Sequence, residues 1–474
     1  MRARAPGVRR EYPTAGLGLA YVAAVVCLMS CSPAKNPVAV IGVDGLEWDV
    51  ALPLIRQGRM PTLEELMRRG SFGMLSTRAP AKSPVIWTTV VTGKNSSKHG
   101  ILDFTRLEAN GERVLYSSTD RRTKAVWNVL TDAGESSAVV GWWNTFPVER
   151  ISGVMVAQVN TLEQLTYRKW IKPGSVAQGA GQVYPAARED EFLEIVEEVG
   201  RELPQLVDSL YAEAAADLSQ PDALKWETCR WSIRSDESVR RIALGLARAR
   251  PFPDLFLVYF GATDIFGHHF WRYHEPEAFR HPPLEARIEK FGSVLARTYE
   301  HADAVLGELI AAMPADATVF VISDHGMQAK HLDARFNLNS DGRPENESGG
   351  HGSGPPGVII AAGPPVRTSN VSHAIRELTR ADLPLIGDVA DITPTLLALR
   401  GLPIGRDMDG SVLEVLLKPQ ALDASGPEFV ATHDTPEWLA ARGKRAEIER
   451  PGHRERLEQL RSLGYLDKTP GDTD

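Results

Sequence analysis

The chain has 474 residues, of which 43% are hydrophobic and 24% are charged, so it is long enough for a large globular core. Its formal net charge of −8 argues against binding to a nucleic-acid polymer, although it leaves a small anionic substrate open. Three cysteines are too few for a disulfide framework or a cysteine-based metal site.

The N-terminus has the pattern of an export signal. Four arginines precede an apolar run at 17–29 that is too short to span a bilayer comfortably. The run leads into the sequence LMSC at 28–31, which resembles a bacterial lipoprotein signal. This resemblance implies a signal peptide over residues 1–30, lipidation of Cys31 and a short tether over residues 31–36. A plain signal anchor or an ordinary secretory peptide is the alternative.

The resemblance to lipoproteins also implies a location. A lipidated Cys31 would anchor the chain to a membrane of the bacterial cell envelope, facing the periplasm. Ser32 follows the cysteine where inner-membrane lipoproteins carry an aspartate, and this favours the outer membrane over the inner one. We therefore expect the membrane as a partner through the lipid alone.

The first predicted strand ends in an acid. Residues 37–43, PVAVIGV, are an apolar run typical of a parallel strand that is buried on both faces. Asp44 follows it, and open α/β sheets bind their ligands at the carboxyl ends of their strands. Alternatively, Asp44 caps a turn. A helix is predicted at 61–70, with proline at its start and glycine at its end.

Residues 81–93 combine a serine with a helix start. Ser83 before Pro84 is typical of an N-cap and a first helical residue. The free amides of such a start favour an anion, and a hydroxyl there can attack phosphorus while the amides hold the developing charge. A plain capping serine is the alternative. The next residues, 93–101, lack the spacing of a P-loop, and we expect His99 to lock this loop rather than bind a metal.

The character of the chain changes at about residue 161. From there to residue 250 strands disappear and charged helical segments take over, so we predict a helical insertion or cap, 161–250, that covers the ligand edge of the sheet. Cys229 lies in this stretch and is expected to serve packing rather than chemistry. The elements predicted around and within it are a helix at 125–133, strands at 137–143 and 153–158, and helices at 189–203 and 231–249.

Another buried strand is predicted at 254–262, DLFLVYFGA. Asp264 and His268 follow it, four residues apart. We expect Gly267 between them to let the chain turn back, so that both side chains face one ion. His269 offers a second choice that the spacing alone does not decide.

The segment TVFVI at 318–322 is the central strand of the prediction, after a long helix at 284–313 that contains His301, expected to be an ordinary surface or packed residue. Asp324 and His325 come after the strand. A carboxylate beside an imidazole is a donor pair that suits zinc. A helix N-cap aspartate is the alternative, and by itself this motif does not choose between the two.

A polar, glycine-rich loop at 332–355 contains His351 between glycines, which bring a side chain close to a site with little steric hindrance. A buried strand at 357–362 and a capped helix at 388–399 follow it. The alternation of strands and helices predicts an α/β fold with a doubly wound, mainly parallel sheet flanked by helices. Its catalytic core is expected over 37–160 and 251–416, with a charged tail at 417–474 that includes an amphipathic helix near 441–463.

Taken together, the motifs resemble the alkaline phosphatase superfamily, and within it the type I phosphodiesterase/nucleotide pyrophosphatase family. They occur in the order found in that family: VIGVDGL, SPVIWTTVVTGKNSSKHGI, ATDIFGHH, VISDHGM, GGHG and DVADITPTLLALRGLP.

The resemblance implies two divalent metal ions, zinc rather than manganese. One would be held by Asp44, Asp324 and His325, with the Ser83 hydroxyl completing its sphere. The other would be held by Asp264, His268 and His351, where His268 is chosen over His269 because the family pattern is Asp-x-x-x-His. Such paired ions suit in-line displacement at phosphorus by a serine nucleophile.

The chain departs from this family in two places. Nucleotide pyrophosphatases usually carry threonine as the nucleophile, where this chain has Ser83. They also carry an asparagine that binds a phosphoryl oxygen, where this chain reads Leu102-Asp103-Phe104. Both departures put a nucleotide substrate in doubt more than the metal core. The sulfatase pattern is absent, because Pro84 directly follows the serine.

The sequence therefore predicts a metal-dependent phosphoryl-transfer hydrolase, most simply a phosphodiesterase that acts on a small phosphate ester. A phosphomonoesterase, or a transferase that moves a phospho-group within the envelope, is the first alternative. A non-catalytic envelope lipoprotein that keeps the fold as a binding platform is the second.

Overall fold

The computed structural model describes residues 35–442 apart from 108–110, 112, 159–180, 334–346, 370–373 and 423–425. From Asn36 onward the chain forms one compact unit. The predicted signal with Cys31 and all but the first two residues of the helix predicted at 441–463 lie outside this part. Every helix within it is too short or too polar to cross a bilayer.

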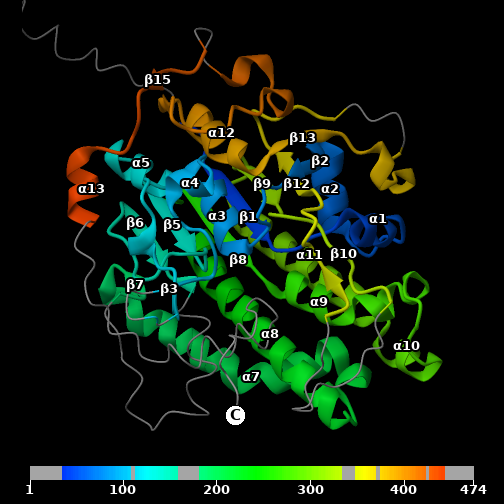
Figure 1. Cartoon of the computed structure of the whole chain (residues 1–474). Coiled ribbons are helices and arrows are strands. Elements are labelled where there is room, and N and C mark those ends of the chain that lie inside the picture. The colour runs from blue at the N-terminus through cyan, green and yellow to red at the C-terminus, as the bar shows by residue number, and fades with distance from the viewer. Residues whose placement is uncertain are drawn as a thin grey trace, which may run out of the picture. The chain divides into compact units, whose positions relative to one another are not determined.

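A sheet of nine strands runs through the middle of the described chain (Figure 1). In chain order its strands are β1 (Val38–Val43), β2 (Ser71–Ser76), β5 (Ser137–Val140), β6 (Gly153–Val156), β7 (Val183–Tyr184), β8 (Leu255–Phe260), β9 (Thr318–Ile322), β12 (Gly357–Ala362) and β13 (Leu385–Asp388). Their order across the sheet is β13-β2-β12-β9-β1-β8-β5-β6-β7. All neighbours are parallel except that β12 runs against β2 and β9, and β7 runs against β6.

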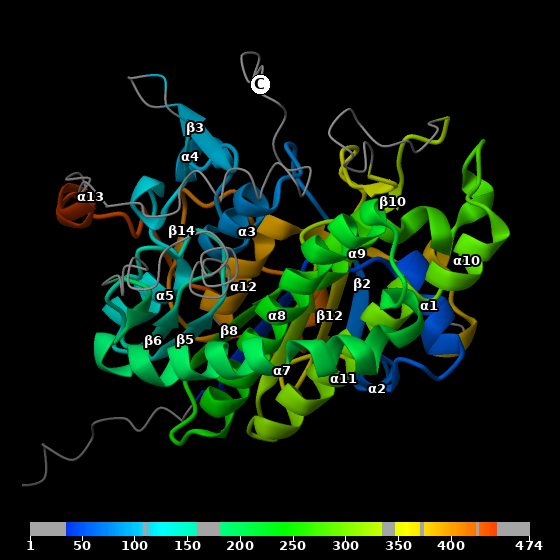
Figure 2. The ribbon, with the colours of Figure 1, turned by 90° about the horizontal axis from the view of Figure 1, so that it is seen from below.

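Helices cover both faces of the sheet (Figures 1 and 2). The core on one face includes side chains of α1 (Trp48–Arg56), α2 (Pro61–Arg69), α7 (Glu189–Ala215), α8 (Gln220–Arg248), α9 (Ala262–His274) and α11 (Val294–Ala312). The core on the other face includes side chains of α3 (Ser83–Thr92), α5 (Val126–Asp132) and α12 (Ile392–Leu399). The doubly wound fold predicted from the sequence is confirmed.

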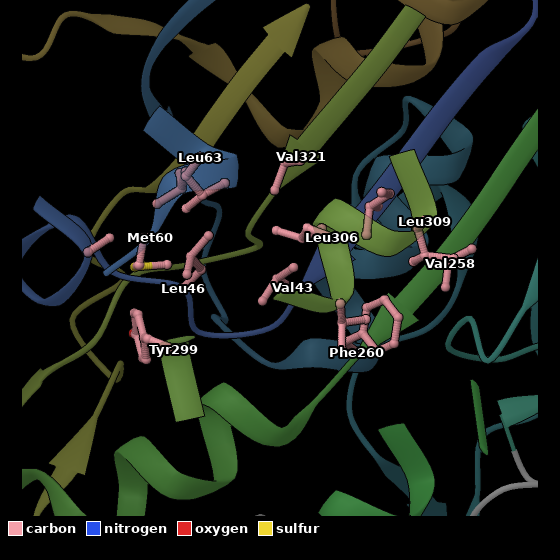
Figure 3. Close-up of a cluster of buried hydrophobic side chains, with 14 of the residues drawn as sticks. Val43, Leu46, Met60, Leu63, Val258, Phe260, Tyr299, Leu306, Leu309 and Val321 are labelled. Carbon is pink, nitrogen blue, oxygen red and sulfur yellow. The ribbon is translucent and has the colours of Figure 1, made fainter. Parts of the chain in front are cut away.

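Strand β1 shows why the sheet is buried on both sides. Ala39, Ile41 and Val43 belong to the first core, and Val38 and Val40 belong to the second, as the two-residue period of a strand requires. All six residues of the strand are buried. Figure 3 shows part of the first core, where strand side chains meet side chains of the flanking helices.

The register of the central strands brings their ends together. Val43 of β1 lies opposite Phe260 of β8, and Gly42 lies opposite Ile322 of β9. The residues that follow these three parallel strands therefore emerge at one edge of the sheet, where an α/β fold places its site.

Several elements differ from the prediction. The helix expected at 284–313 is broken near Gly292 into α10 (Glu285–Phe291) and α11. The strands β2 and β13 were not predicted, because their short sequences contain glycine and polar residues instead of an apolar run. The strand expected at 137–143 ends at Val140, because Gly141 turns the chain with a φ of 71°.

The described part of the predicted insertion is mostly helical, but it also supplies strand β7 to the sheet, where no strand was expected. Its helices lie on a face of the sheet. Helix α8 contacts β8 and β5, and α7 lies against α8 (Figure 2). Both helices are longer than the sequence suggested. Cys229 is buried within α8, which agrees with its predicted packing role.

The beginning of the predicted tail lies against the core. Strand β15 (Phe429–Val430) pairs with β14 (Ile404–Gly405), and helix α13 (Pro436–Arg442) follows. The buried ammonium of Lys94 donates to carboxylates of Asp407 and Asp434, at 2.6 Å each. The remaining short elements are α4 (Ser96–His99) and the strands β3 (Thr105–Leu107), β4 (Arg113–Leu115), β10 (Gln328–Ala329) and β11 (Gly349–Gly350).

Candidate active site

Three predicted ligands follow the central strands β1 and β9. Asp44, Asp324 and His325 are fully buried, and their ligand atoms lie within 4.8 Å of one another. Nε2 of His325 is 3.4 Å from Oδ1 of Asp44 and 3.3 Å from Oδ2 of Asp324. The structure therefore brings this predicted set together.

Asp264 and His268 lie one turn apart on helix α9, and Nε2 of His268 is 3.4 Å from Oδ1 of Asp264. The turn predicted at Gly267 was wrong, because the helix continues to His274 and its own period places both side chains on one face. The Met327 side chain lies close to the helix at Gly267, since a Cβ on residue 267 would be 2.7 Å from Cε of Met327.

His351 follows β11 and completes the cluster. Its Nε2 lies 3.8 Å from Oδ1 of Asp264, and its ring stacks on His325 with 3.6 Å between centroids. Ligand atoms of Asp264, His325 and His351 again lie within 4.8 Å of one another. His325, which the sequence assigned to one ion only, therefore lies in both groups. The predicted ligand His268 belongs to neither group and reaches the cluster through Asp264, and His269 also belongs to neither.

Hydrogen bonds orient two of the imidazoles. Nδ1 of His268 is 3.0 Å from the Gly349 carbonyl oxygen and 3.2 Å from a carboxylate oxygen of Glu347, while Nδ1 of His325 is 3.1 Å from the Gly326 carbonyl oxygen. Both rings therefore present Nε2 to the carboxylates of the cluster. Partners of this kind fix the orientation of metal-binding histidines.

Asp44 has partners that were not predicted. Its Oδ2 accepts hydrogen bonds from the Trp87 indole at 3.0 Å and from the Tyr259 hydroxyl at 2.6 Å. The hydroxyl of Thr263 donates to the Asp44 carbonyl oxygen. These contacts come from α3, β8 and α9, so only the tertiary fold reveals them. For Trp87, its position four residues after Ser83 was the one available signal.

The electrostatics of the cluster favour a cation. Burial, together with the Asp264 charge, raises the pKa of Asp44 to about 7. Burial and the charges of Asp44 and Asp264 raise the pKa of Asp324 well above its usual value. Carboxylates this close cannot all be ionised inside a protein without a compensating charge.

The donor set also fits divalent ions. Within the described chain, Oδ1 of Asp44, both carboxylate oxygens of Asp324, and Nε2 of His325 make no hydrogen bond. Buried polar atoms of this kind need a partner, and a bound ion would supply it. Carboxylate oxygen and imidazole nitrogen are ligands of zinc and of manganese.

Ser83 is fully buried at the start of α3. The structure corrects its predicted position by one residue, since Lys82 is the N-cap and Ser83 begins α3. Its Oγ makes no hydrogen bond within the described residues, so Ser83 is not a capping serine. Trp87, one turn further along α3, donates to Asp44, and the His351 ring interacts with the Ala81 carbonyl. Both contacts hold the start of α3 at the cluster.

The start of α3 offers fewer free amides than the sequence suggested. Pro84 has no N–H, and the N–H groups of Val85 and Ile86 donate to the Lys82 carbonyl oxygen. The Ser83 N–H is the group left to face an anion from the first turn. Lys82 itself forms an ion pair with Asp103.

His99 locks the loop after α3, as predicted. Its Nδ1 accepts a hydrogen bond from the Ile101 N–H at 3.1 Å, so Nε2 carries the proton and faces the Thr89 hydroxyl at 3.1 Å. Burial, with the Arg121 charge, lowers the pKa of His99 to about 3. The ring is therefore neutral at ordinary pH and lies outside both ligand groups.

Comparison with known proteins decides the family. Residues 38–381 match the family described as type I phosphodiesterase / nucleotide pyrophosphatase. The chain belongs to this family. As a type I phosphodiesterase/nucleotide pyrophosphatase family member, it is a hydrolase of the alkaline phosphatase superfamily, and the family is metal-dependent. No curated protein matches the chain in sequence.

Solved structures of similar fold share little sequence with this family member. Human ectonucleotide pyrophosphatase/phosphodiesterase 5 is 14% identical, with a TM-score of 0.47 over 81% of this chain and 100% of that one. Phosphonoacetate hydrolase from Sinorhizobium meliloti is 17% identical, with a TM-score of 0.38 over 65% and 59%. A putative sulfatase from Bacteroides thetaiotaomicron is 11% identical, with a TM-score of 0.42 over 81% and 74%. Likeness at this level says nothing about the substrate.

Proposed function

We propose that this chain is an exported, lipid-anchored phosphodiesterase with Ser83 as its nucleophile and two divalent ions, zinc rather than manganese, in its site. One observation carries the proposal. A buried hydroxyl that makes no hydrogen bond in the described chain stands at the start of α3, the helix whose Trp87 donates to Asp44 in a buried cluster of carboxylates and imidazoles.

Asp44, Asp324 and His325 would hold one ion, and Asp264, His268 and His351 the other, with His325 close to both. Bound at such a site, paired ions supply Lewis acidity and neutralise charge on a phosphoryl group. The hydrogen bonds from Trp87 and Tyr259 to Oδ2 of Asp44 leave its Oδ1 free to act as the ligand atom.

The protein's own residues then account for the reaction in two steps. Ser83 Oγ gives up its proton to solvent and attacks phosphorus in line with the leaving alkoxide, so that a P–O bond to serine forms as the P–O bond to the leaving group breaks and the alkoxide takes up a proton from solvent. The Ser83 N–H can donate to a non-bridging oxygen. Water then attacks phosphorus from the side that the leaving group vacated, which releases the phosphoryl product and restores the hydroxyl.

The test compares Ser83→Ala with the wild type and with Ser97→Ala, an exposed serine on α4 whose hydroxyl bonds only to Asn95 among the contacts described. The chain beginning after Cys31 would be assayed on bis-p-nitrophenyl phosphate and p-nitrophenyl phosphate, with its bound metals counted. We expect Ser83→Ala to lose turnover by a factor of about 10⁴ or more while keeping its metals. Turnover like that of the wild type would refute Ser83 as the nucleophile.

The same assay separates the alternatives. A chelator-sensitive preference for the diester supports a phosphodiesterase, and a preference for the monoester would indicate a phosphatase instead. Transfer of the phospho-group to an added alcohol would indicate a transferase. A chain with no bound metal and no activity would favour the non-catalytic binding platform. For the anchor, Cys31→Ser should move the protein from the membrane fraction to the soluble fraction.

A further inference from the structure

The helix that carries Asp264 and His268 is fastened at its start by another helix. Helix α9 begins after Gly261, and none of its own side chains caps it. Instead, the carboxylate of Asp236 on α8 accepts hydrogen bonds from the N–H of Gly261 at 3.0 Å and from the N–H of Ala262 at 2.9 Å. A carboxylate at this position satisfies two amides of the helix start and complements its dipole.

The same turn of α9 touches the cluster directly. Thr263 follows the two amides bound by Asp236, and its hydroxyl donates to the Asp44 carbonyl oxygen. Asp264 comes next, and His268 lies one helical turn beyond it. A shift of the first turn would therefore move a ligand of each proposed ion.

Side-chain packing is not the only interaction that holds the start of α9 against α8. A cavity of about 30 Å³ lies beneath the start of α9 and is large enough for about two waters. Val43 and Phe260, labelled in Figure 3, form part of its wall, together with Ala262, Thr263 and Asp236. Beside this cavity, the two hydrogen bonds to Asp236 and the one from Thr263 tie the start of α9 to its neighbours.

Within the part of the chain that the structure describes, the Asp236 carboxylate forms no salt bridge. Burial raises its pKa to about 7, and the interactions that oppose this rise are the two hydrogen bonds from Gly261 and Ala262. The next residue, Glu237, is different, because it pairs with Arg240 at 2.6 Å and with Arg241 at 2.7 Å on its own helix. The Asp236 carboxylate is therefore held by the backbone amides at the start of α9.

We propose that Asp236 is a positioning residue of the metal site, which fixes the first turn of α9 from helix α8 and so sets the positions of Asp264 and His268. The inference rests on the proposed function, since it takes these two residues as metal ligands. It gives the helical stretch between residues 181 and 250 a role in the chemistry of the sheet edge.

The experiment measures zinc retention in Asp236→Asn and in the matched control Glu237→Gln. The asparagine keeps the shape of the side chain but offers one acceptor to two amides. We expect Asp236→Asn to release one zinc per chain at about tenfold lower chelator concentration than the wild type, and to regain turnover as zinc is added. Glu237→Gln should lose stability without any change in zinc retention.

Three outcomes would count against the inference. If Asp236→Asn retained zinc like the wild type and lost only thermal stability, as Glu237→Gln is expected to, Asp236 would be merely structural. Should Asp236→Asn fail to fold, Asp236→Ser gives the same comparison with a shorter acceptor, and zinc retention like that of the wild type would again overturn the proposal. A wild type that binds no zinc would overturn the proposed function itself, and this inference with it.

Discussion

The two halves of the ligand cluster are built in different ways. Asp44, Asp324 and His325 directly follow the central strands β1 and β9 and are fully buried. Asp264 and His268 stand on a helix, and His351 follows β11 with 11% of its side chain exposed. We call the first set the strand-end half and the second set the helix half.

The strand-end half is tied to its surroundings more densely. Ser323 Oγ accepts from the Leu46 N–H at 3.0 Å and donates to the His325 carbonyl oxygen at 2.7 Å. Buried Glu47 accepts from the Met327 N–H at 2.9 Å and pairs with Arg380. Strand ends locked in this way form a rigid site, whereas the helix half depends on how α9 and the His351 loop are held. We therefore expect the two ions to differ in how readily they exchange.

The largest effect should come from the strand-end half. Asp324→Asn removes the charge of a proposed ligand whose two oxygens make no hydrogen bond among the described residues. We expect diesterase turnover to fall by about 10³-fold or more, and bound metal to fall below two ions per chain, because the shared His325 couples the halves. Turnover and metal counts are the measurements. Retention of two ions would show that the ligand set is wrong.

A milder loss is expected in the helix half. His351→Gln removes the most exposed of the three imidazoles, so this half should lose its ion while the strand-end half keeps one. We expect about one zinc per chain and turnover about 10²-fold lower, partly restored by added zinc. If His351→Gln lost both ions and resisted rescue, the contrast between the halves would be false.

Chelation of the wild type tests the same contrast without a mutation. The less tightly held helix half should give up its ion first, so zinc per chain should fall in two steps as chelator is added. The step at lower chelator concentration should be missing in His351→Gln. A single step for both ions would argue that the halves behave as one site.

Glu47→Gln tests the fixation of the strand-end half. The amide keeps the shape of the side chain but weakens the hydrogen bond from Met327 and the ion pair with Arg380. We expect about tenfold weaker zinc retention in the step at higher chelator concentration. Glu64→Gln is the matched control, since Glu64 pairs with the exposed Arg376 far from any ligand. Equal effects of the two variants would contradict the role of Glu47.

The smallest effect concerns an imidazole outside both halves. The pKa of His99 is lowered to about 3 in the folded protein, below the value of an exposed histidine. The contribution of the buried, neutral His99 to the free energy of unfolding is therefore fully present above about pH 6.5, and it is lost as the pH falls toward 3. The free energy of unfolding, measured in urea for the metal-free wild type and for His99→Gln, should fall less between pH 8 and pH 5 in the variant. An equal loss would mean that His99 is not buried neutral.

The features predicted from the sequence are those that depend on local pattern. Apolar runs identify β1 and β9, and Asp44 and Asp324 are found simply by following those runs to their ends. The spacing of four residues is enough to place Asp264 and His268 on one face of a helix, although the turn assigned to Gly267 was wrong. Local pattern also missed the break near Gly292, because α10 and α11 share one helical periodicity.

The contacts that position the ligands were not predictable in this way. Asp236, Glu47 and Glu347 lie far in sequence from the residues they hold, and nothing in their local sequence distinguishes them from surface acids. Trp87 and Tyr259 appear as ordinary core aromatics until the fold brings them to Asp44. Such partners depend on tertiary contacts, so a single sequence carries no signal for them beyond the position of Trp87 one helical turn after Ser83.

The salt bridges of Lys94 bear on how this protein should be handled. The family match ends at residue 381, yet Asp407 and Asp434 lie beyond it and neutralise a buried ammonium just past the helix that begins with Ser83. A recombinant fragment that ends with the family match would leave the Lys94 ammonium buried without its two carboxylate partners, at a cost of several kcal/mol. Domain boundaries for expression should therefore follow these carboxylates rather than the edge of sequence similarity.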